Sequence, residues 1–208
     1  MVRMPARPYH HGDLRSALLA SAERTLLEKG VAALSLRELA RDIGVSHAAP
    51  GRHFKDKQAL VDALALSGFE RMAQVLNGAD DAQAPLEDRL VALATTYVHF
   101  AASNAELLEV MYTRKHDPDI SEQLSAAVES TTVPFVRIIA DAQERGEIVA
   151  GDPWTVSLVV GAALHGTASF AAQGTLTPEA AVAGIPTLIH HLLNGLTPRE
   201  NERRATTT

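Results

Sequence analysis

Cysteine is absent from this chain of 208 residues, which excludes disulfide bonds, catalytic thiolates and cysteine-based zinc sites. Aromatic residues are also scarce, at 4% of the sequence, whereas 46% of the residues are hydrophobic, with much alanine and leucine. We find no internal repeat, and no stretch of any length alternates between apolar and polar residues as a strand does. The composition therefore favours an all-α protein.

Long apolar runs are missing as well. None approaches the length of a membrane span, and the N-terminal residues MVRMPARPYHHG lack the apolar stretch of a signal peptide. We therefore expect a cytoplasmic protein without a membrane partner. Nucleotide-binding glycine motifs and the G-x-S-x-G elbow are also absent, so an all-α enzyme is the less favoured alternative and no cofactor is expected.

Charge is unevenly distributed along the chain. The net charge is −6, but residues 1–60 carry ten Lys and Arg against six Asp and Glu, a balance of +4 with four histidines besides. Residues 61–208 carry nine against nineteen, a balance of −10. A basic segment on an acidic body suits a protein that touches phosphate with one end only.

The most informative stretch is SLRELARDIGVSHAAPGRHFKDK, residues 35–57. It predicts a short helix capped by Ser35 and Glu38, a turn at Gly44, and a second helix over 47–54 that Ser46 would cap. Asp56 could cap the helix that follows. Two helices joined by a glycine turn are how helix-turn-helix proteins present a recognition helix to DNA, although an ordinary helical hairpin has the same pattern.

At these residues the sequence resembles the tetracycline-repressor (TetR) family of bacterial regulators. The resemblance rests on LSLRELARDIGVS, on RHF and on Lys57, and a subset of the family is similar at YHHGDLR and HAAP. The pattern of Trp154 followed by His165-Gly166 is similar to that subset's C-terminal domain. The resemblance implies double-stranded operator DNA as a partner, a homodimer and an unknown small-molecule effector.

The predicted DNA contacts are concentrated on and beside the expected recognition helix. Arg52 could read a base edge or grip phosphate, and Lys57 should grip phosphate, helped by backbone N–H groups at the start of its helix. The family usually carries an aromatic residue where this chain has Gly51, so one phosphate contact is expected to be missing. The full set of predicted DNA-binding residues is Arg37, Ser46, His47, Ala48, Arg52, His53 and Lys57.

Helical periodicity and capping signals predict about nine helices. They cover residues 13–29, 36–43, 47–54, 57–76, 86–102, 105–112, 120–145, 153–172 and 178–193. We expect a basic arm over 1–12, whose Arg3 and Arg7 could reach a minor groove, although a frayed terminus is the simpler interpretation. A DNA-binding domain over 13–60, a ligand-binding and dimerisation domain over 61–196 and a disordered tail over 197–208 would follow.

The second domain carries candidate inward residues that would form either a plain core or a pocket for a mostly apolar effector. His165 stands out because it lies in a small, apolar run and a buried imidazole needs partners for both ring nitrogens. A structural role is the leading interpretation for that histidine. The predicted ligand-binding residues are Tyr97, Phe100, Met111, Phe135, Ile138, His165 and Phe170.

Metal binding is not expected. His190 and His191 are adjacent and so point in different directions on a helix, whereas His10 and His11 lie in the expected arm. No H-x-x-x-H pair or helical cluster of carboxylates with histidine is present. Acids such as Asp80, Asp81, Glu87 and Asp88 suggest solvated surface.

The last two helices are apolar over more of their circumference than one bundle core requires. A two-fold axis that pairs both helices with their copies would bury the excess, and it would space two recognition helices for a palindrome. The predicted interface residues are Val156, Val160, Ala163, Ala181, Ile185, Leu188 and Leu192. The sequence thus favours a ligand-released repressor, with a ligand-independent architectural DNA-binding protein as the alternative.

Overall fold

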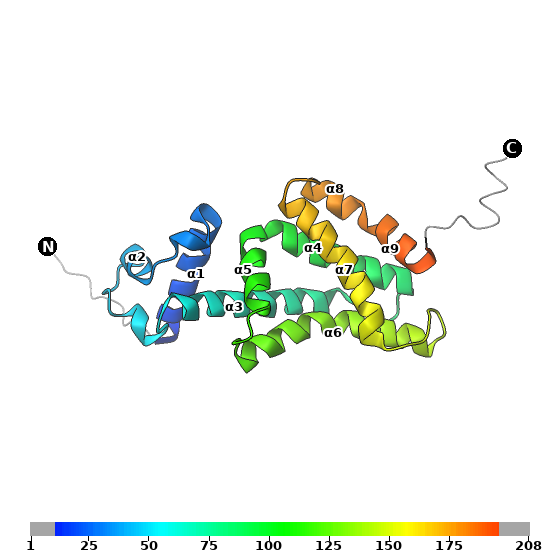
Figure 1. The fold of residues 1–208 in the computed structure, drawn as a ribbon, viewed down its shortest axis with the longest axis horizontal. Coiled ribbons are helices and arrows are strands. Elements are labelled where there is room, and N and C mark those ends of the chain that lie inside the picture. Colours follow the sequence, from blue (N-terminus) through cyan, green and yellow to red (C-terminus); the bar gives the residue numbers. More distant parts are fainter. Residues whose placement is uncertain (1–10, 196–208) are drawn as a thin grey trace, which may run out of the picture. The chain divides into compact units, whose positions relative to one another are not determined.

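The structure, a computed structural model, describes residues 11–195, which form nine α-helices and two short 3-10 helices without a strand (Figure 1). The predicted all-α class is therefore confirmed. The predicted arm and tail, with Arg3, Arg7 and His10, lie outside the described residues, except that His11 and Gly12 already belong to the first helix.

The described chain divides into two compact units, which we describe one at a time. The first consists of residues 11–71 and 104–130, and the second of residues 72–103 and 131–195. The division falls within two long helices, α3 (Lys57–Ala79) and α6 (Glu122–Glu144). The boundary expected at residue 60 stays a prediction about where the DNA-binding part ends.

The first unit is built around α1 (His11–Lys29), which packs on both α2 (Leu36–Asp42) and α5 (Ala105–Lys115). Gly30 ends α1 at a φ of 76°, and the short 3-10 helix η1 (Val31–Ala33) leads on to α2. Burial of the shared apolar faces supplies the main stabilisation. The core includes Leu18, Ala22, Leu26, Leu34, Leu39, Ala40, Phe54, Leu60 and Leu64.

Within the same unit, α3 and α5 approach each other closely at Gly68. A Cβ atom at this position would lie 2.5 Å from the Sδ atom of Met111 and 3.3 Å from Leu107. A real Cβ atom essentially never lies as close as 2.5 Å to another atom, so the absence of a side chain at Gly68 allows the two helices to pack with Met111 in this position. Met111 is fully buried there.

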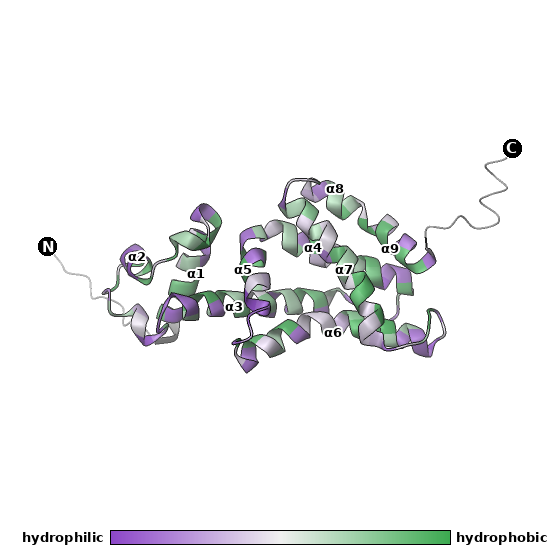
Figure 2. Ribbon diagram, viewed as in Figure 1, coloured by the Kyte–Doolittle hydropathy of each residue, from purple (hydrophilic) through white to green (hydrophobic). Residues whose placement is uncertain are grey.

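The second unit is organised around α4 (Leu86–Ser103), which contacts α7 (Pro153–Ala172), α8 (Pro178–Ala183) and α9 (Ile185–Asn194). Hydrophobic residues run along most of α7, as Figure 2 shows. The core of this unit includes Leu90, Leu93, Val98, Ile138, Ile139, Leu164, Ala181, Ile185 and Ile189.

The start signals of the C-terminal helices are confirmed. Asp152 accepts hydrogen bonds from the backbone N–H groups of Trp154 and Thr155, and Thr177 accepts one from Ala180 at 3.1 Å. The single last helix predicted over 178–193 is wrong, because α8 ends at Ala183 and α9 begins at Ile185. Pro186, in the first turn of α9, has no N–H with which to continue the ladder of α8.

A buried ion cluster joins the segment after α3 to α4 and α6 in the second unit. Arg89, only 1% exposed, donates to both carboxylate oxygens of Asp80 at 2.8 and 3.0 Å and to Asp141 at 3.1 Å. Arg137 also donates to Asp80, at 3.0 Å. The hydrogen bond from Arg89 holds the pKa of Asp80 below its usual value. The expectation that Asp80 lies on solvated surface is therefore wrong.

Candidate nucleic-acid interface

The turn after α2 has the geometry that the sequence predicts. Gly44 adopts a φ of 73°, in the left-handed region that glycine tolerates. Val45 then donates its N–H to the carbonyl of Ala40 at 2.9 Å, and Gly44 donates to Arg41 at 3.1 Å. This closure of the helix by a left-handed residue reverses the chain and leaves residues 46–48 exposed at the surface.

The predicted second helix over 47–54 is wrong. Residues 47–49 form a turn, and only Pro50–Arg52 form a single turn of 3-10 helix, η2. Most backbone bonds here span three residues: Ala49 donates to Ser46, Arg52 to Ala49, and His53 to Pro50. One bond, from Phe54 to Pro50, spans four residues as in an α-helix. Pro50 has no N–H to bond back to Ser46, and glycine at position 51 costs free energy in a helix relative to alanine. The longer series of α-helical hydrogen bonds therefore does not form.

Two buried side chains hold this turn on the first unit. Pro50 is buried, and the Phe54 side chain is 2% exposed, with the Arg15 guanidinium 5.5 Å from its ring centroid. Gly51 is exposed, and a Cβ atom there would meet nothing within 4 Å. Packing thus anchors the chain at Pro50, where η2 begins, and at Phe54, just after η2, but leaves space around Gly51 between them.

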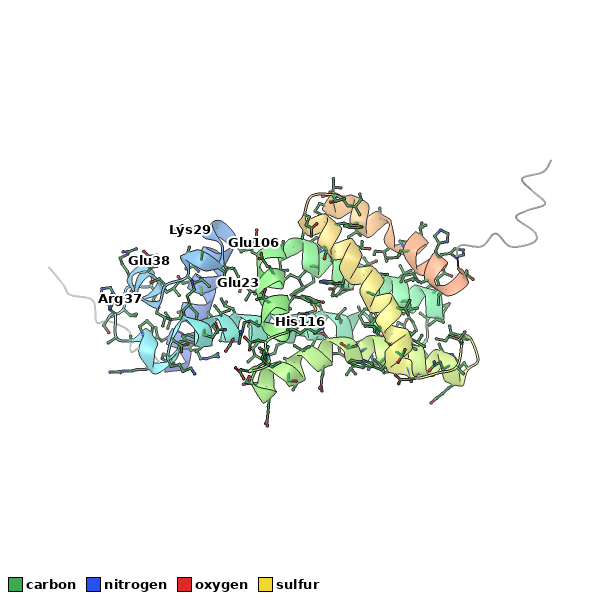
Figure 3. The ribbon with its side chains drawn as sticks, viewed as in Figure 1. Glu23, Lys29, Arg37, Glu38, Glu106 and His116 are labelled. Atoms are coloured by element: carbon green, nitrogen blue, oxygen red, sulfur yellow. The ribbon has the colours of Figure 1, made fainter. Side chains whose placement is uncertain are left out.

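The capping predicted around this motif is confirmed only in part. Ser35 occupies the N-cap position of α2, but its side chain makes no capping hydrogen bond, and Ser46 does not begin a helix. Glu38 instead lies 3.6 Å from Arg41, and the side chains of Arg37 and Glu38 extend from α2 (Figure 3). Asp56 does cap α3, because its Oδ1 accepts from the N–H of Ala59 at 2.8 Å.

Most of the predicted DNA-binding residues lie on the surface of one short region. Six are exposed: Arg37, Ser46, His47, Ala48, Arg52 and Lys57. His53 is half-buried, and its Nε2 has no hydrogen-bond partner among the described residues. The structure therefore exposes Ser46, His47 and Arg52 on the turn, with Arg37 on α2 and Lys57 at the start of α3, where they could face a phosphate or a base edge.

Two features at the start of α3 alter the expected phosphate site. Lys57 Nζ donates to the backbone carbonyl of Ala32 at 3.0 Å, so this ammonium already has a partner within the chain. The carboxylate of Asp56 occupies the N–H of Ala59, one of the groups that would hold a phosphate. A bound phosphate would compete with both contacts.

The predicted ligand residues are only partly brought together. The Tyr97 hydroxyl lies 3.3 Å from His165 Nδ1, so α4 and α7 share a polar contact. Phe135 and Ile138 are buried and Phe100 is half-buried. Phe170, expected to face inward, is instead 52% exposed, and Met111 belongs to the core of the first unit.

The second unit also carries an open groove of about 510 Å³ between the end of α4 and α8. Its walls are mostly small and apolar, with His99 and Glu179 as the ionisable groups. None of the predicted ligand residues lines it. Its lining residues are His99, Ala102, Ser103, Pro178, Glu179, Val182 and Ala183.

Two ion clusters were not predicted from the sequence. Arg89 lies three residues after Leu86 and directly before Leu90, inside the apolar stripe of α4, and that position could have signalled a buried charge with a carboxylate partner. The second cluster is Arg114 with Asp62 and Asp117. Within the described residues, no group of three His, Asp or Glu side chains could hold a metal ion, and His190 pairs with Glu87 instead.

Two family profiles match the chain. "Bacterial regulatory proteins, tetR family" matches residues 18–64, and "Tetracyclin repressor-like, C-terminal domain" matches residues 90–194. The first match runs from α1 into α3 and so contains every predicted DNA-binding residue. The second covers half of the chain.

Solved structures and a curated protein are similar as well. A protein of unknown function from Rhodococcus sp. RHA1 is 43% identical with a TM-score of 0.83, over 93% of this chain and 100% of that one. A tetR-family bacterial regulatory protein from Rhodococcus RHA1 shares the fold, at 23% identity and a TM-score of 0.68, over 89% and 98%. HTH-type transcriptional repressor Rv1474c of Mycobacterium tuberculosis is 41% identical over 66 residues, 32% of this chain and 35% of that protein. This match spans about a third of the repressor's length.

Proposed function

The chain belongs to the TetR family of bacterial regulatory proteins, which are DNA-binding transcription regulators rather than enzymes, and we propose that it represses transcription from a palindromic operator. In this proposal a homodimer binds the operator in the cytoplasm. A small, mostly apolar effector then releases the dimer.

The exposed turn over residues 46–52 carries the proposal. Buried Pro50 and Phe54 hold the C-terminal part of this turn and the residues after it on the first unit, while Arg52 and its polar neighbours are exposed. Binding residues are often presented on loops that a rigid scaffold holds, and the positive charge of Arg52 suits a polyanion. In this proposal Arg52 reads a base edge or grips phosphate, and Lys57 leaves the carbonyl of Ala32 to bind a phosphate oxygen.

The experiment is a selection from random-sequence DNA, followed by fluorescence anisotropy on the recovered site. We expect Arg52→Ala to weaken binding about tenfold or more, because a good base contact discriminates by roughly 1–3 kcal/mol. Arg145→Ala is the control, since it removes the same charge from an exposed position in the second unit. Equal losses in the two variants would refute the placement of Arg52.

The exposed apolar face of α7 supports the homodimer. Trp154, Leu158 and Val159 are 52%, 65% and 59% exposed, although α7 is strongly apolar. By length and composition alone α7 could span a membrane. In a family of DNA-binding regulators, a second copy of the chain explains this face better, because large exposed apolar patches mark interaction sites.

The structure changes which residues would form this interface. Val160, Ala181 and Ile185 are buried inside one chain, where α7, α8 and α9 pack on α4 and one another, so they offer no surface to a partner. Val156, Ala163, Leu188 and Leu192 are half-buried and remain candidates. We expect Leu158→Glu with Val159→Glu to give monomers that lose the specific site. Sedimentation that still shows a dimer would refute this interface.

The groove between α4 and α8 supports an effector site. Its volume of about 510 Å³ falls in the range of pockets that hold small ligands, and its walls are largely apolar. The ligand must bind the DNA-free state more tightly, or it shifts nothing. A ligand screen by thermal shift, repeated on Val182→Trp, tests this. If no binder alters DNA affinity, the result favours the alternative of a ligand-independent architectural DNA-binding protein.

A further inference from the structure

A separate small cavity lies in the first unit, between the end of α1 and the face of α5. It has a volume of about 100 Å³. Its apolar walls come from Leu26, Val31, Val61 and Val110. Val31, at the mouth, is 41% exposed, although the other three are buried. The cavity therefore offers an apolar surface that the chain itself does not cover.

The rim of this cavity is acidic. Glu106 and Glu109 line it from α5, three residues apart and so on one face of the helix, and both are exposed (Figure 3 labels Glu106). Neither carboxylate makes a hydrogen bond or an ion pair with a residue in the described part of the chain. Two negative charges thus lie beside an apolar cavity, and neither is paired with a cation among the described residues.

The one cation among the lining residues is already engaged. Arg114 donates from Nε to Asp62 at 2.6 Å and from Nη1 to Asp117 at 2.5 Å. These two carboxylates more than balance its charge, so Arg114 does not attract an anionic ligand. The local field at the cavity mouth favours a positive group.

We propose that this cavity binds a small alkylammonium ion. An apolar cavity of roughly 150 Å³ can hold benzene, so one of about 100 Å³ suits a branched alkyl group of three or four carbons. The alkyl group fills the space between Leu26, Val61 and Val110. The ammonium lies at the mouth and donates hydrogen bonds to Glu106 and Glu109. The site is distinct from the groove beside α8.

The test is valine-methyl NMR on the full-length protein titrated with isobutylammonium, and in parallel with isobutanol and isobutyrate at the same pH and ionic strength. We expect isobutylammonium to shift the methyl signals of Val31, Val61 and Val110 with a millimolar dissociation constant. The neutral alcohol should bind about tenfold more weakly, and isobutyrate should not bind. Failure of isobutylammonium to shift these signals overturns the site.

Two sets of variants test the acidic rim and the apolar cavity separately. Glu106→Gln with Glu109→Gln should weaken isobutylammonium about tenfold while leaving isobutanol unchanged, because exposed charge pairs contribute modestly. Val31→Phe should block the mouth, whereas Leu27→Phe, also exposed on the same segment but outside the cavity, should not. Equal binding to wild type and Val31→Phe would show that the ligand lies elsewhere. None of these outcomes depends on operator binding.

Discussion

Substitution of Asp80 by asparagine should strongly destabilise the second unit. Asparagine keeps the shape of aspartate but loses the charge, and Asp80 is the partner that Arg89 contacts through two hydrogen bonds. The side chains of Asp80 and Arg89 are 3% and 1% exposed, so water cannot replace the lost charge. Arg89 would keep Asp141 as its single charged partner, and its Nη1 is already buried without a partner among the described residues.

The size of the effect follows from that burial. Removal of one partner of a buried ion pair usually costs about 3–5 kcal/mol, because the other charge stays buried. Since Asp141 still contacts Arg89, we expect a value near 3 kcal/mol. For a chain of this length, 1 kcal/mol shifts the melting temperature by roughly 2–4 °C, so a decrease of about 6–12 °C should follow.

Circular dichroism during thermal and urea unfolding measures both quantities. Glu147→Gln is the matched control, because Glu147 pairs with Arg145 at 2.6 Å, but both side chains are at least 40% exposed. Exposed pairs contribute about 0–1 kcal/mol. If Asp80→Asn costs no more than Glu147→Gln, the buried cluster does not hold the unit together and the reasoning fails.

The same cluster predicts a pH dependence. The hydrogen bond from Arg89 lowers the pKa of Asp80 in the folded state, below its usual value of 3.8. The charged form of Asp80 therefore contributes its full stabilisation above pH 3.8, the usual pKa. This stabilisation is lost as the pH falls from 3.8 through the lower pKa of the folded state. The difference in unfolding free energy between wild type and Asp80→Asn should be constant from pH 7 to 5 and shrink below pH 3.8. A constant difference at pH 3 would contradict this assignment.

Three further substitutions test other features. Lys57→Ala should weaken binding to all DNA sequences alike and flatten the salt dependence of anisotropy titrations, and an unchanged slope would contradict the phosphate contact. Gly51→Tyr should leave the melting temperature unchanged because the position is open, so any loss of specific binding reports on the DNA itself. Gly68→Ala should destabilise by about 1–3 kcal/mol through its clash with Met111, whereas Gly78→Ala, unobstructed in the same helix, should stabilise slightly in urea unfolding.

Local signals predicted the local structure well. The Asp152-Pro153 and Thr177-Pro178 starts and the left-handed Gly44 depend on residues a few positions apart, and the structure confirms them. The helix expected over 47–54 does not form, because Pro50 cannot donate the first intrahelical hydrogen bond and Gly51 after it disfavours a helix.

Features that depend on residues far apart in the sequence could not be predicted from such local signals. Asp80 is polar and follows a helix, which suggested solvent, but its partners Arg89 and Arg137 come from α4 and α6. The cavity beside α5 likewise combines residues from α1, α3 and α5. Such sites are set by how helices pack, which the spacing along one helix does not determine.

The turn that follows α2 assigns stability and recognition to different residues, two requirements that often conflict in evolution. Its anchors, Pro50 and Phe54, are buried, whereas Ser46, His47 and Arg52 project into solvent and add little to the core. Replacement of the exposed side chains should therefore cost little stability. A lineage that carries this turn can exchange one recognition preference for another by single substitutions, and a duplicated copy can diverge toward a new site without first acquiring compensating changes in its core.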